Sequence, residues 1–187
     1  MTIFSDSLKA HYATVQLLDP LEATIVKVCS DITGAFKNGN KVLLLGNGGS
    51  AADAQHIAAE LVGRFKLQRR ALPAIALTTD TSILTALGND YSFEYVFCRQ
   101  VEALAQNGDI VIGISTSGNS VNILKGIQSA VAAGCTTIGL LGGNGGTLKS
   151  EVDTAILVPS NDTPRIQECH ILLGHIICDI VERNFAH

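Results

Sequence analysis

Five short apolar runs recur along the chain, and their spacing constrains the fold more than any other feature. Each run reads as a strand that is covered by helices on both faces of its sheet. Each is separated from the next by a segment long enough for a crossover helix, so the strands are expected to pair in parallel. The runs are residues 41–45, 73–77, 110–114, 136–140 and 154–158. The sequence therefore predicts an α/β fold, with a doubly wound, five-stranded parallel sheet flanked by helices.

Two leading helices are expected before the first strand. Asp19 and Pro20 provide an N-cap and a first helical residue, and Glu22 is placed to complete a capping box. Apolar residues then recur at helical spacing up to Phe36, and Gly39 follows where a left-handed cap would lie. After the last strand, residues 163–183 are apolar on several sides and predict a long helix with neighbours on most faces.

The domain organisation is predicted to be simple. No linker, low-complexity tract or fixed-period repeat divides the sequence. We expect one domain over residues 1–187, in which residues 1–39 form helices used in oligomer packing and residues 40–187 form the α/β core and the C-terminal helix. Composition favours association, because 47% of the residues are hydrophobic and only 16% are charged.

Charge and apolar patterning argue against several classes of protein. The chain has 13 Lys+Arg against 17 Asp+Glu and no basic run, so nucleic acid is not an expected partner. The N-terminus lacks the pattern of a secretory signal, and the apolar stretches end well before the length that crosses a bilayer, so no membrane partner is expected. The cysteines include no Cys-x-x-Cys pair and are interpreted as buried, reduced thiols. They are Cys29, Cys98, Cys135, Cys169 and Cys178.

A glycine-rich loop follows the first strand and is suited to an anion. Its glycines allow close backbone approach to a ligand, and Ser50 is expected to cap the next helix and turn its hydroxyl toward a negative charge. An ordinary strand-to-helix turn remains the alternative, since the loop matches neither nucleotide fingerprint. The loop residues are Gly46, Asn47, Gly48, Gly49 and Ser50.

A second loop, after the strand at 110–114, gathers four hydroxyl groups in six residues. Hydroxyls and backbone N–H groups at the start of a helix bind phosphate without a cation. A serine-rich helix cap is the alternative, although a cap needs only one such residue. Both loops belong at the carboxyl ends of strands, where open α/β sheets bind ligands. The hydroxyl residues are Ser115, Thr116, Ser117 and Ser120.

Polar residues on two predicted helices complete the set of candidates. His56 and Glu60 are four residues apart and share a helix face, so they form either an acid–base or metal pair or a surface interaction. On the C-terminal helix, Gln167 and His175 are two turns apart and are able to reach one ligand. His170 is interpreted as a core histidine. Asn89 and Asp90 follow an apolar helix and are also consistent with a simple turn.

Together, these motifs resemble the sugar isomerase (SIS) domain family over essentially the whole chain. The resemblance rests on residues 46–50, His56 with Glu60, residues 89–90, 115–120 and 165–168, and His175. It implies an SIS-type, flavodoxin-like fold. Its most similar members are cytoplasmic homotetramers that convert sedoheptulose 7-phosphate to D-glycero-D-manno-heptose 7-phosphate, an early step of ADP-heptose and lipopolysaccharide core synthesis. They share each active site between subunits.

The resemblance also implies roles for individual residues. Glu60 and His175 would act as general acid and base, in either order, through an enediol. One zinc ion per subunit would be held by His56, Glu60, Gln167 and His175. Substrate would contact Asn47, Gly48, Gly49, Ser50, Glu60, Asn89, Asp90, Ser115, Thr116, Ser117, Ser120 and Gln167.

Two other functions are compatible with the same fold. One is a non-enzymatic tetrameric scaffold that binds the bacterial replication initiator; in that relative, the counterparts of Glu60 and His175 are unable to transfer protons, whereas this chain has both. The other is a sugar-phosphate sensor, which is usually joined to a DNA-binding region that is not expected here. One departure concerns Thr163, Pro164 and Arg165, since some isomerases place an acidic residue before the arginine.

Overall fold

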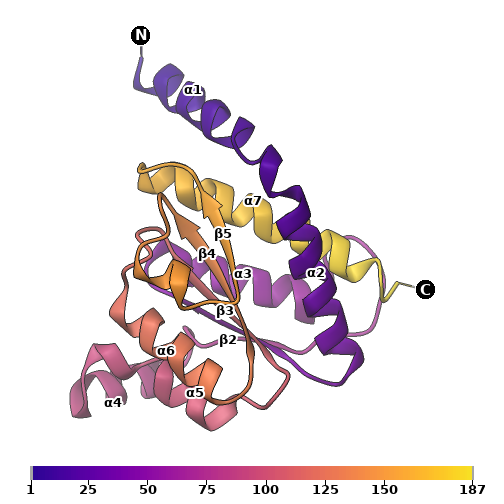
Figure 1. Ribbon diagram of the computed structural model, residues 1–187, viewed down its shortest axis with the longest axis vertical. Helices are drawn as coiled ribbons and strands as arrows, with labels where there is room; N and C mark the ends of the chain where they lie inside the picture. Colours follow the sequence, from indigo (N-terminus) through magenta and orange to yellow (C-terminus); the bar gives the residue numbers. More distant parts are fainter. Residues whose placement is uncertain (1, 187) are drawn as a thin grey trace.

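The five predicted strands form one parallel sheet in the computed structural model, which describes residues 2–186 (Figure 1). The strand order is β2-β1-β3-β4-β5, and every neighbouring pair is parallel. The predicted α/β, doubly wound fold is therefore confirmed. The strands are β1 (Val42–Gly46), β2 (Ala74–Ala76), β3 (Ile110–Ser115), β4 (Thr136–Gly142) and β5 (Thr154–Val158).

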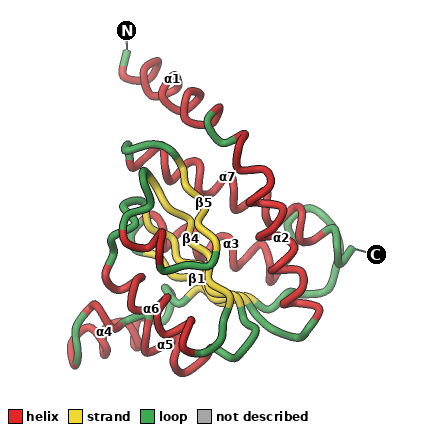
Figure 2. The backbone as a smooth tube through the Cα atoms, viewed as in Figure 1, coloured by secondary structure: helices red, strands yellow, loops and turns green. Residues whose placement is uncertain are grey.

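Helices cover both faces of the sheet, as the apolar runs require (Figures 1 and 2). One face packs against α2 (Glu22–Lys37), α3 (Gly49–Val62) and α7 (Thr163–Glu182), and the other against α4 (Thr81–Asp90), α5 (Cys98–Leu104) and α6 (Val121–Ala132). In β1, Val42 and Leu44 enter the first of these apolar clusters while Leu43 and Leu45 enter the second. The strand is apolar throughout because both of its faces are buried.

The first helix, α1 (Ile3–Gln16), extends away from the sheet and is held by α7 (Figure 1). His11 Nδ1 lies 2.7 Å from Glu168 Oε2, and the guanidinium of Arg165 donates to the carbonyl of Ser7 at 2.8 Å. Burial alone would raise the pKa of Glu168, but hydrogen bonds from His11 and Arg165 outweigh it and lower that pKa. Several apolar side chains of α1 nevertheless remain exposed, among them Ile3, Phe4 and Tyr12.

The predicted helix ends are partly corrected. Residues Asp19–Leu21 form a 3₁₀ turn (η1), and α2 begins at Glu22 without a side-chain cap, so the predicted cap at Asp19 is wrong. The backbone is already helical from Leu18 onward. The backbone N–H groups just before α2 therefore donate to carbonyls of the preceding turn and need no side-chain cap. Gly39 has φ 84°, which confirms the left-handed cap.

Two further sequence predictions are confirmed. All five cysteines are buried free thiols. The long C-terminal helix is α7, which ends at Glu182 and carries Pro164 in its first turn. Short 3₁₀ turns also occur at Phe93–Tyr95 (η2) and Thr147–Ser150 (η3). Between residues 2 and 186, none of the helices combines the length and apolar character needed to cross a membrane.

Candidate functional site

The two predicted anion loops meet at the carboxyl ends of β1 and β3. Gly46 is the register partner of Ile114, so residues 47–50 and 115–120 leave the sheet side by side. The side-chain amides of Asn47 and Asn122 exchange two hydrogen bonds, at 2.9 and 2.8 Å, which tie the first loop to the start of α6. Asn122 was not among the predicted residues, although an amide two positions after Ser120 is a usable signal.

The hydroxyl loop is folded around Ser115. Its Oγ lies 3.1 Å from Ser120 Oγ and accepts a hydrogen bond from the backbone N–H of Gly118 at 3.1 Å. Ser117 accepts from the backbone N–H of Asn119. Three of the four predicted hydroxyls thus order the loop itself, while the side chain of Thr116 makes no hydrogen bond within residues 2–186 and lines a cavity.

The glycine loop needs its glycines for steric reasons. A Cβ on Gly46 would lie 2.3 Å from the carbonyl oxygen of Ser50, and Gly48 has φ 55°. Gly48 occupies the N-cap position and α3 begins at Gly49. The predicted capping role of Ser50 is therefore wrong, because the helix begins one residue before it and Ser50 is buried in the first turn.

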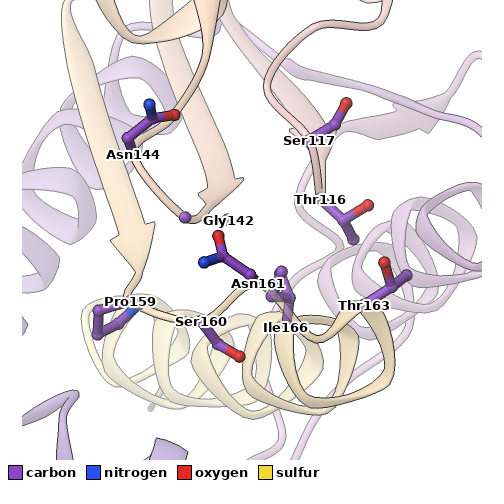
Figure 3. Close-up of a pocket in the computed structure, with 10 residues that line it drawn as sticks. Thr116, Ser117, Gly142, Asn144, Pro159, Ser160, Asn161, Thr163 and Ile166 are labelled. Carbon is purple, nitrogen blue, oxygen red and sulfur yellow. The ribbon is translucent and has the colours of Figure 1, made fainter.

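A cavity of about 600 Å³ opens beside the hydroxyl loop at the carboxyl ends of β3, β4 and β5 (Figure 3). Two predicted residues, Thr116 and Ser117, line it. The other lining residues end or follow β4, follow β5 or begin α7, and they were not among the predicted site residues because no local motif marks those turns. They are Gly142, Gly143, Asn144, Pro159, Ser160, Asn161, Thr163 and Ile166.

Helices α3 and α7 lie side by side and run in the same direction. Near their starts, a Cβ on Gly49 would lie 2.4 Å from Gln167 Nε2. Further along, a Cβ on Gly174 would lie 2.7 Å from the side chain of Ile57. These two glycines allow the close approach that places the second half of α3 against the second half of α7.

That approach brings His56, Glu60 and His175 together within one chain. His175 Nε2 lies 3.0 Å from His56 Nε2, and His56 Nε2 lies 3.1 Å from Glu60 Oε1. One donor atom from each residue lies within 4.8 Å of the other two. A carboxylate on an early helix and an imidazole on the last helix thus lie close together within one chain.

The cluster has the composition of a metal site. Two imidazoles and a carboxylate are a common three-ligand set for zinc, with the fourth position open to water or substrate. Ligand bonds of about 2.0–2.1 Å place the corners of a zinc tetrahedron about 3.3 Å apart, close to the two shorter separations measured here. The residues present therefore fit a zinc ion.

A buried ion pair holds the end of α3 next to this cluster. Arg69 and Glu182 have fully buried side chains, with Arg69 Nε 3.8 Å from Glu182 Oε2. Arg69 also donates to the carbonyl of Glu60 at 2.7 Å, and Glu182 accepts from the backbone N–H of Phe65 at 3.1 Å. The network fixes the turn that carries Glu60, and no sequence motif indicated it.

Other predicted site residues lie apart from the cluster in a single chain. Gln167 is beside Gly49, and eight residues of helix separate it from His175, which corresponds to about 12 Å of axial rise. Asn89 and Asp90 end α4, on the opposite face of the sheet, and Asn89 donates to the Asp90 carboxylate at 2.8 Å. His170 is fully buried, as expected for a core histidine.

The cavity and the cluster are also separate within one chain. Ile166 lines the cavity and His175 belongs to the cluster, and both lie on α7. The nine residues of helix between them correspond to about 13.5 Å. The cluster is therefore not part of the cavity lining in this chain.

Comparison with known proteins identifies the family. The model of the SIS domain matches residues 8–142. The phosphoheptose isomerase of Citrifermentans bemidjiense is 60% identical over 178 residues, which cover 95% of this chain and 93% of the relative. The solved phosphoheptose isomerase from Neisseria gonorrhoeae is 43% identical, with a TM-score of 0.87 over 96% of this chain and 95% of that one. The one from Francisella tularensis is 39% identical, with a TM-score of 0.88 over 96% and 94%.

Proposed function

We propose that this chain, which belongs to the SIS domain family and within it to the phosphoheptose isomerases, converts sedoheptulose 7-phosphate to D-glycero-D-manno-heptose 7-phosphate. The reaction is an early step of ADP-heptose and lipopolysaccharide core synthesis. The observation that carries the proposal is the meeting of Glu60 and His175 on adjacent helices, in a chain that also has a hydroxyl-lined loop at the carboxyl ends of its strands.

The isomerisation needs two proton-transfer groups. A base removes a proton from C1 of the ketose, the C2 carbonyl oxygen gains a proton, and the double bond shifts to join C1 and C2. The enediol then receives a proton at C2 while the C1 hydroxyl loses its own, which leaves the aldehyde. Glu60 and His175 are the residues that we assign to these transfers, in an order that reverses with direction.

The hydroxyl loop is assigned to the phosphate. Ser115, Ser117 and Ser120 and the first backbone N–H groups of α6 present several donors without a cation. Asn47, Gly48, Gly49 and Ser50 form the adjoining wall. Gln167, Asn89 and Asp90 are proposed substrate contacts as well, and Thr116, Asn161 and Thr163 extend the cradle into the cavity shown in Figure 3.

A zinc ion is proposed as the metal of the cluster, one per subunit. His56, Glu60 and His175 of one chain would hold it. Gln167 of the same chain lies about 12 Å along α7 from His175, so its proposed role as a fourth ligand would require a neighbouring subunit to bring it to the cluster. Bound at the cluster, the ion would supply Lewis-acid polarisation of the sugar carbonyl. The same side-chain atoms of Glu60 and His175 would bind the metal or transfer protons. An assay with and without chelator therefore tests whether turnover requires the metal.

A homotetramer with shared active sites is proposed, because one chain does not complete the site. The cluster lies about 13.5 Å along α7 from Ile166 in the cavity lining, and Asn89 and Asp90 lie on the opposite face of the sheet. A neighbouring subunit would supply the missing side. Exposed apolar residues on α1 support its use in packing between subunits, together with α2 in the leading segment of a single domain. A cytoplasmic location is proposed with this role.

The test is aldose formation from sedoheptulose 7-phosphate by purified protein, with and without chelator. Glu60→Gln and His175→Asn should each lower turnover by about a hundredfold or more. Glu102→Gln is the matched control, because Glu102 pairs with Arg99 on an exposed helix face. Turnover that survives both changes would refute the assignment of the proton-transfer pair.

The scaffold alternative is not supported. The relatives described above are isomerases, and this chain keeps both proton-transfer residues in contact range of the same histidine. Saturable binding of the replication initiator without any turnover would reverse this conclusion.

A further inference from the structure

Asp53 is a carboxylate on the same helix as the cluster, and one of its oxygens is unpaired. Its Oδ2 is buried and makes no hydrogen bond to any of residues 2–186. Gly49 and Ile57, one turn before and one turn after it on α3, both face α7. Asp53 therefore lies in the stripe that packs toward α7, between Gln167 and the cluster.

Asp53 is half-buried, and an oxygen that is removed from water without a hydrogen bond costs free energy. Burial raises the pKa of Asp53 to about 6, and His56 acts in the opposite direction. A residue that destabilises the metal-free protein has a reason to be there if the metal-bound protein needs it.

The ring of His56 also has a nitrogen without a hydrogen-bond partner among the described residues. Its Nε2 faces Glu60 and His175, and no hydrogen bond from Nδ1 is found in the part of the chain that the structure describes. A neutral imidazole carries one proton. When that proton is on Nε2, pointing at the Glu60 carboxylate, Nδ1 is a bare acceptor and has nothing to donate to Asp53.

The situation reverses when Nε2 serves as a metal ligand. The nitrogen that binds metal must be free of its proton, so the proton of a neutral ring sits on Nδ1. Ligating histidines almost always donate this second N–H to a carboxylate, a carbonyl or water. Side chains on a helix lean toward the preceding turn, and for His56 that turn contains Asp53.

We infer that Asp53 is a positioning residue, which accepts a hydrogen bond from Nδ1–H of His56 and so fixes the ring with its Nε2 lone pair toward Glu60 and His175. The inference rests on the proposed metal site of the isomerase and assigns a residue outside its ligand set. Asp53 touches neither the substrate nor the metal in this role. Its contribution is to the tautomer and orientation of His56.

The experiment compares zinc affinity by competition with a chromophoric chelator, using the purified, metal-stripped full chain. Asp53→Asn and Asp53→Ala should each weaken zinc binding by about 10- to 100-fold, whereas Asp53→Glu should recover part of the loss. Gln55→Ala is the matched control on the same helix, because Gln55 points instead to Thr78. The melting temperature of the metal-free Asp53 variants should equal or exceed that of wild type, since the substitution removes an unpaired buried oxygen.

A second readout reports the tautomer rather than the affinity. The ¹⁵N chemical shifts of His56 report its tautomer, and addition of zinc to wild type should move the proton to Nδ1, with a weaker preference in Asp53→Ala. Unchanged zinc affinity in Asp53→Ala would overturn the inference. So would a lower melting temperature in the metal-free variants, which would make Asp53 a structural residue.

The wild-type controls separate this inference from the proposed function. Wild-type turnover of sedoheptulose 7-phosphate tests the isomerase directly, whatever Asp53 does. Zinc binding that His56→Ala leaves intact would place the metal elsewhere and would overturn both the proposed metal site and the role of Asp53.

Discussion

The ring of Phe65 stacks on the ring of His175, with centroids 5.2 Å apart and planes inclined by 19°. Phe65 is itself held, since its backbone N–H donates to Glu182 and Lys66 Nζ lies 4.9 Å from the centroid of its ring. The imidazole that we assign to proton transfer therefore rests on a fixed aromatic face, which restricts its rotamer and leaves its Nε2 directed at His56.

Loss of this face should slow the reaction without abolishing it. Phe65→Leu is expected to lower kcat by about fivefold with little change in KM, because an aromatic stack contributes about 1 kcal/mol to ring placement. Phe65→Tyr keeps the stack and should keep the rate. Steady-state kinetics over a range of pH check this, and a Leu variant with the wild-type rate and pH profile would show that the stack does not position His175.

Zinc should stabilise the folded protein through the cluster. At a free concentration 100 times the dissociation constant, a ligand that binds only the folded state adds about 2.7 kcal/mol. The measurement is the rise in melting temperature on adding zinc to chelator-treated protein at one protein concentration. His56→Ala should remove the rise, while His11→Ala, a histidine outside the cluster, should retain it. An equal rise in both variants would argue against the cluster as the binding site.

The Arg69–Glu182 pair should be a large determinant of stability. Glu182→Gln leaves Arg69 charged, buried and unpaired, so we expect a loss of about 3–5 kcal/mol in the free energy of unfolding. The double variant Arg69→Met, Glu182→Gln should lose less than the sum of the single changes, because neither charge is then left alone. Urea unfolding checks both, with Arg99→Met as an exposed control that should cost at most about 1 kcal/mol. Additive losses would contradict the pairing.

His170 should make stability depend on pH. Burial lowers its pKa from 6.5 to about 4, partly opposed by the backbone of Leu141. Between these values the folded state keeps the ring neutral while the unfolded state protonates it, so unfolding takes up a proton and stability falls as the pH drops below about 6.5. Between pH 7 and pH 5 the loss due to this group is about 2 kcal/mol.

The variant His170→Leu tests this, because leucine has no group to protonate. Between pH 7 and pH 5, the free energy of unfolding of the variant should fall by about 2 kcal/mol less than that of wild type. Identical pH dependence in the two proteins would show that the buried ring is not the source.

Local sequence was most informative where one short segment carries the whole signal. The run at Val42–Leu45 predicts a strand buried on both faces, since every residue in it is apolar, and β1 confirms this. The four-residue spacing of His56 and Glu60 predicts that they share a helix face. Their side chains do lie 3.1 Å apart, in the same cluster as His175. The predicted caps at Asp19 and Ser50 failed, because the preceding backbone was already helical or a glycine had taken the cap position.

Residues that act through distant partners were beyond local reasoning. Nothing near Phe65, Arg69 or Glu182 in the sequence indicates that they meet, since they join the end of α3 to the end of α7. Asn161 lines the cavity because three strands end there, and no motif marks the turn that carries it.

The sequence by itself determined the α/β class, the order of strands and helices, the two ligand loops and the candidates for proton transfer. These depend on apolar periodicity, on turn chemistry and on helix spacing, all of which act over a few residues. Only the tertiary structure decided that His175 meets His56 and Glu60 while Gln167 lies two turns away against Gly49. That outcome depends on the register between α3 and α7, which is fixed by the packing of Gly174 on Ile57 and of Gln167 on Gly49, contacts between segments more than a hundred residues apart.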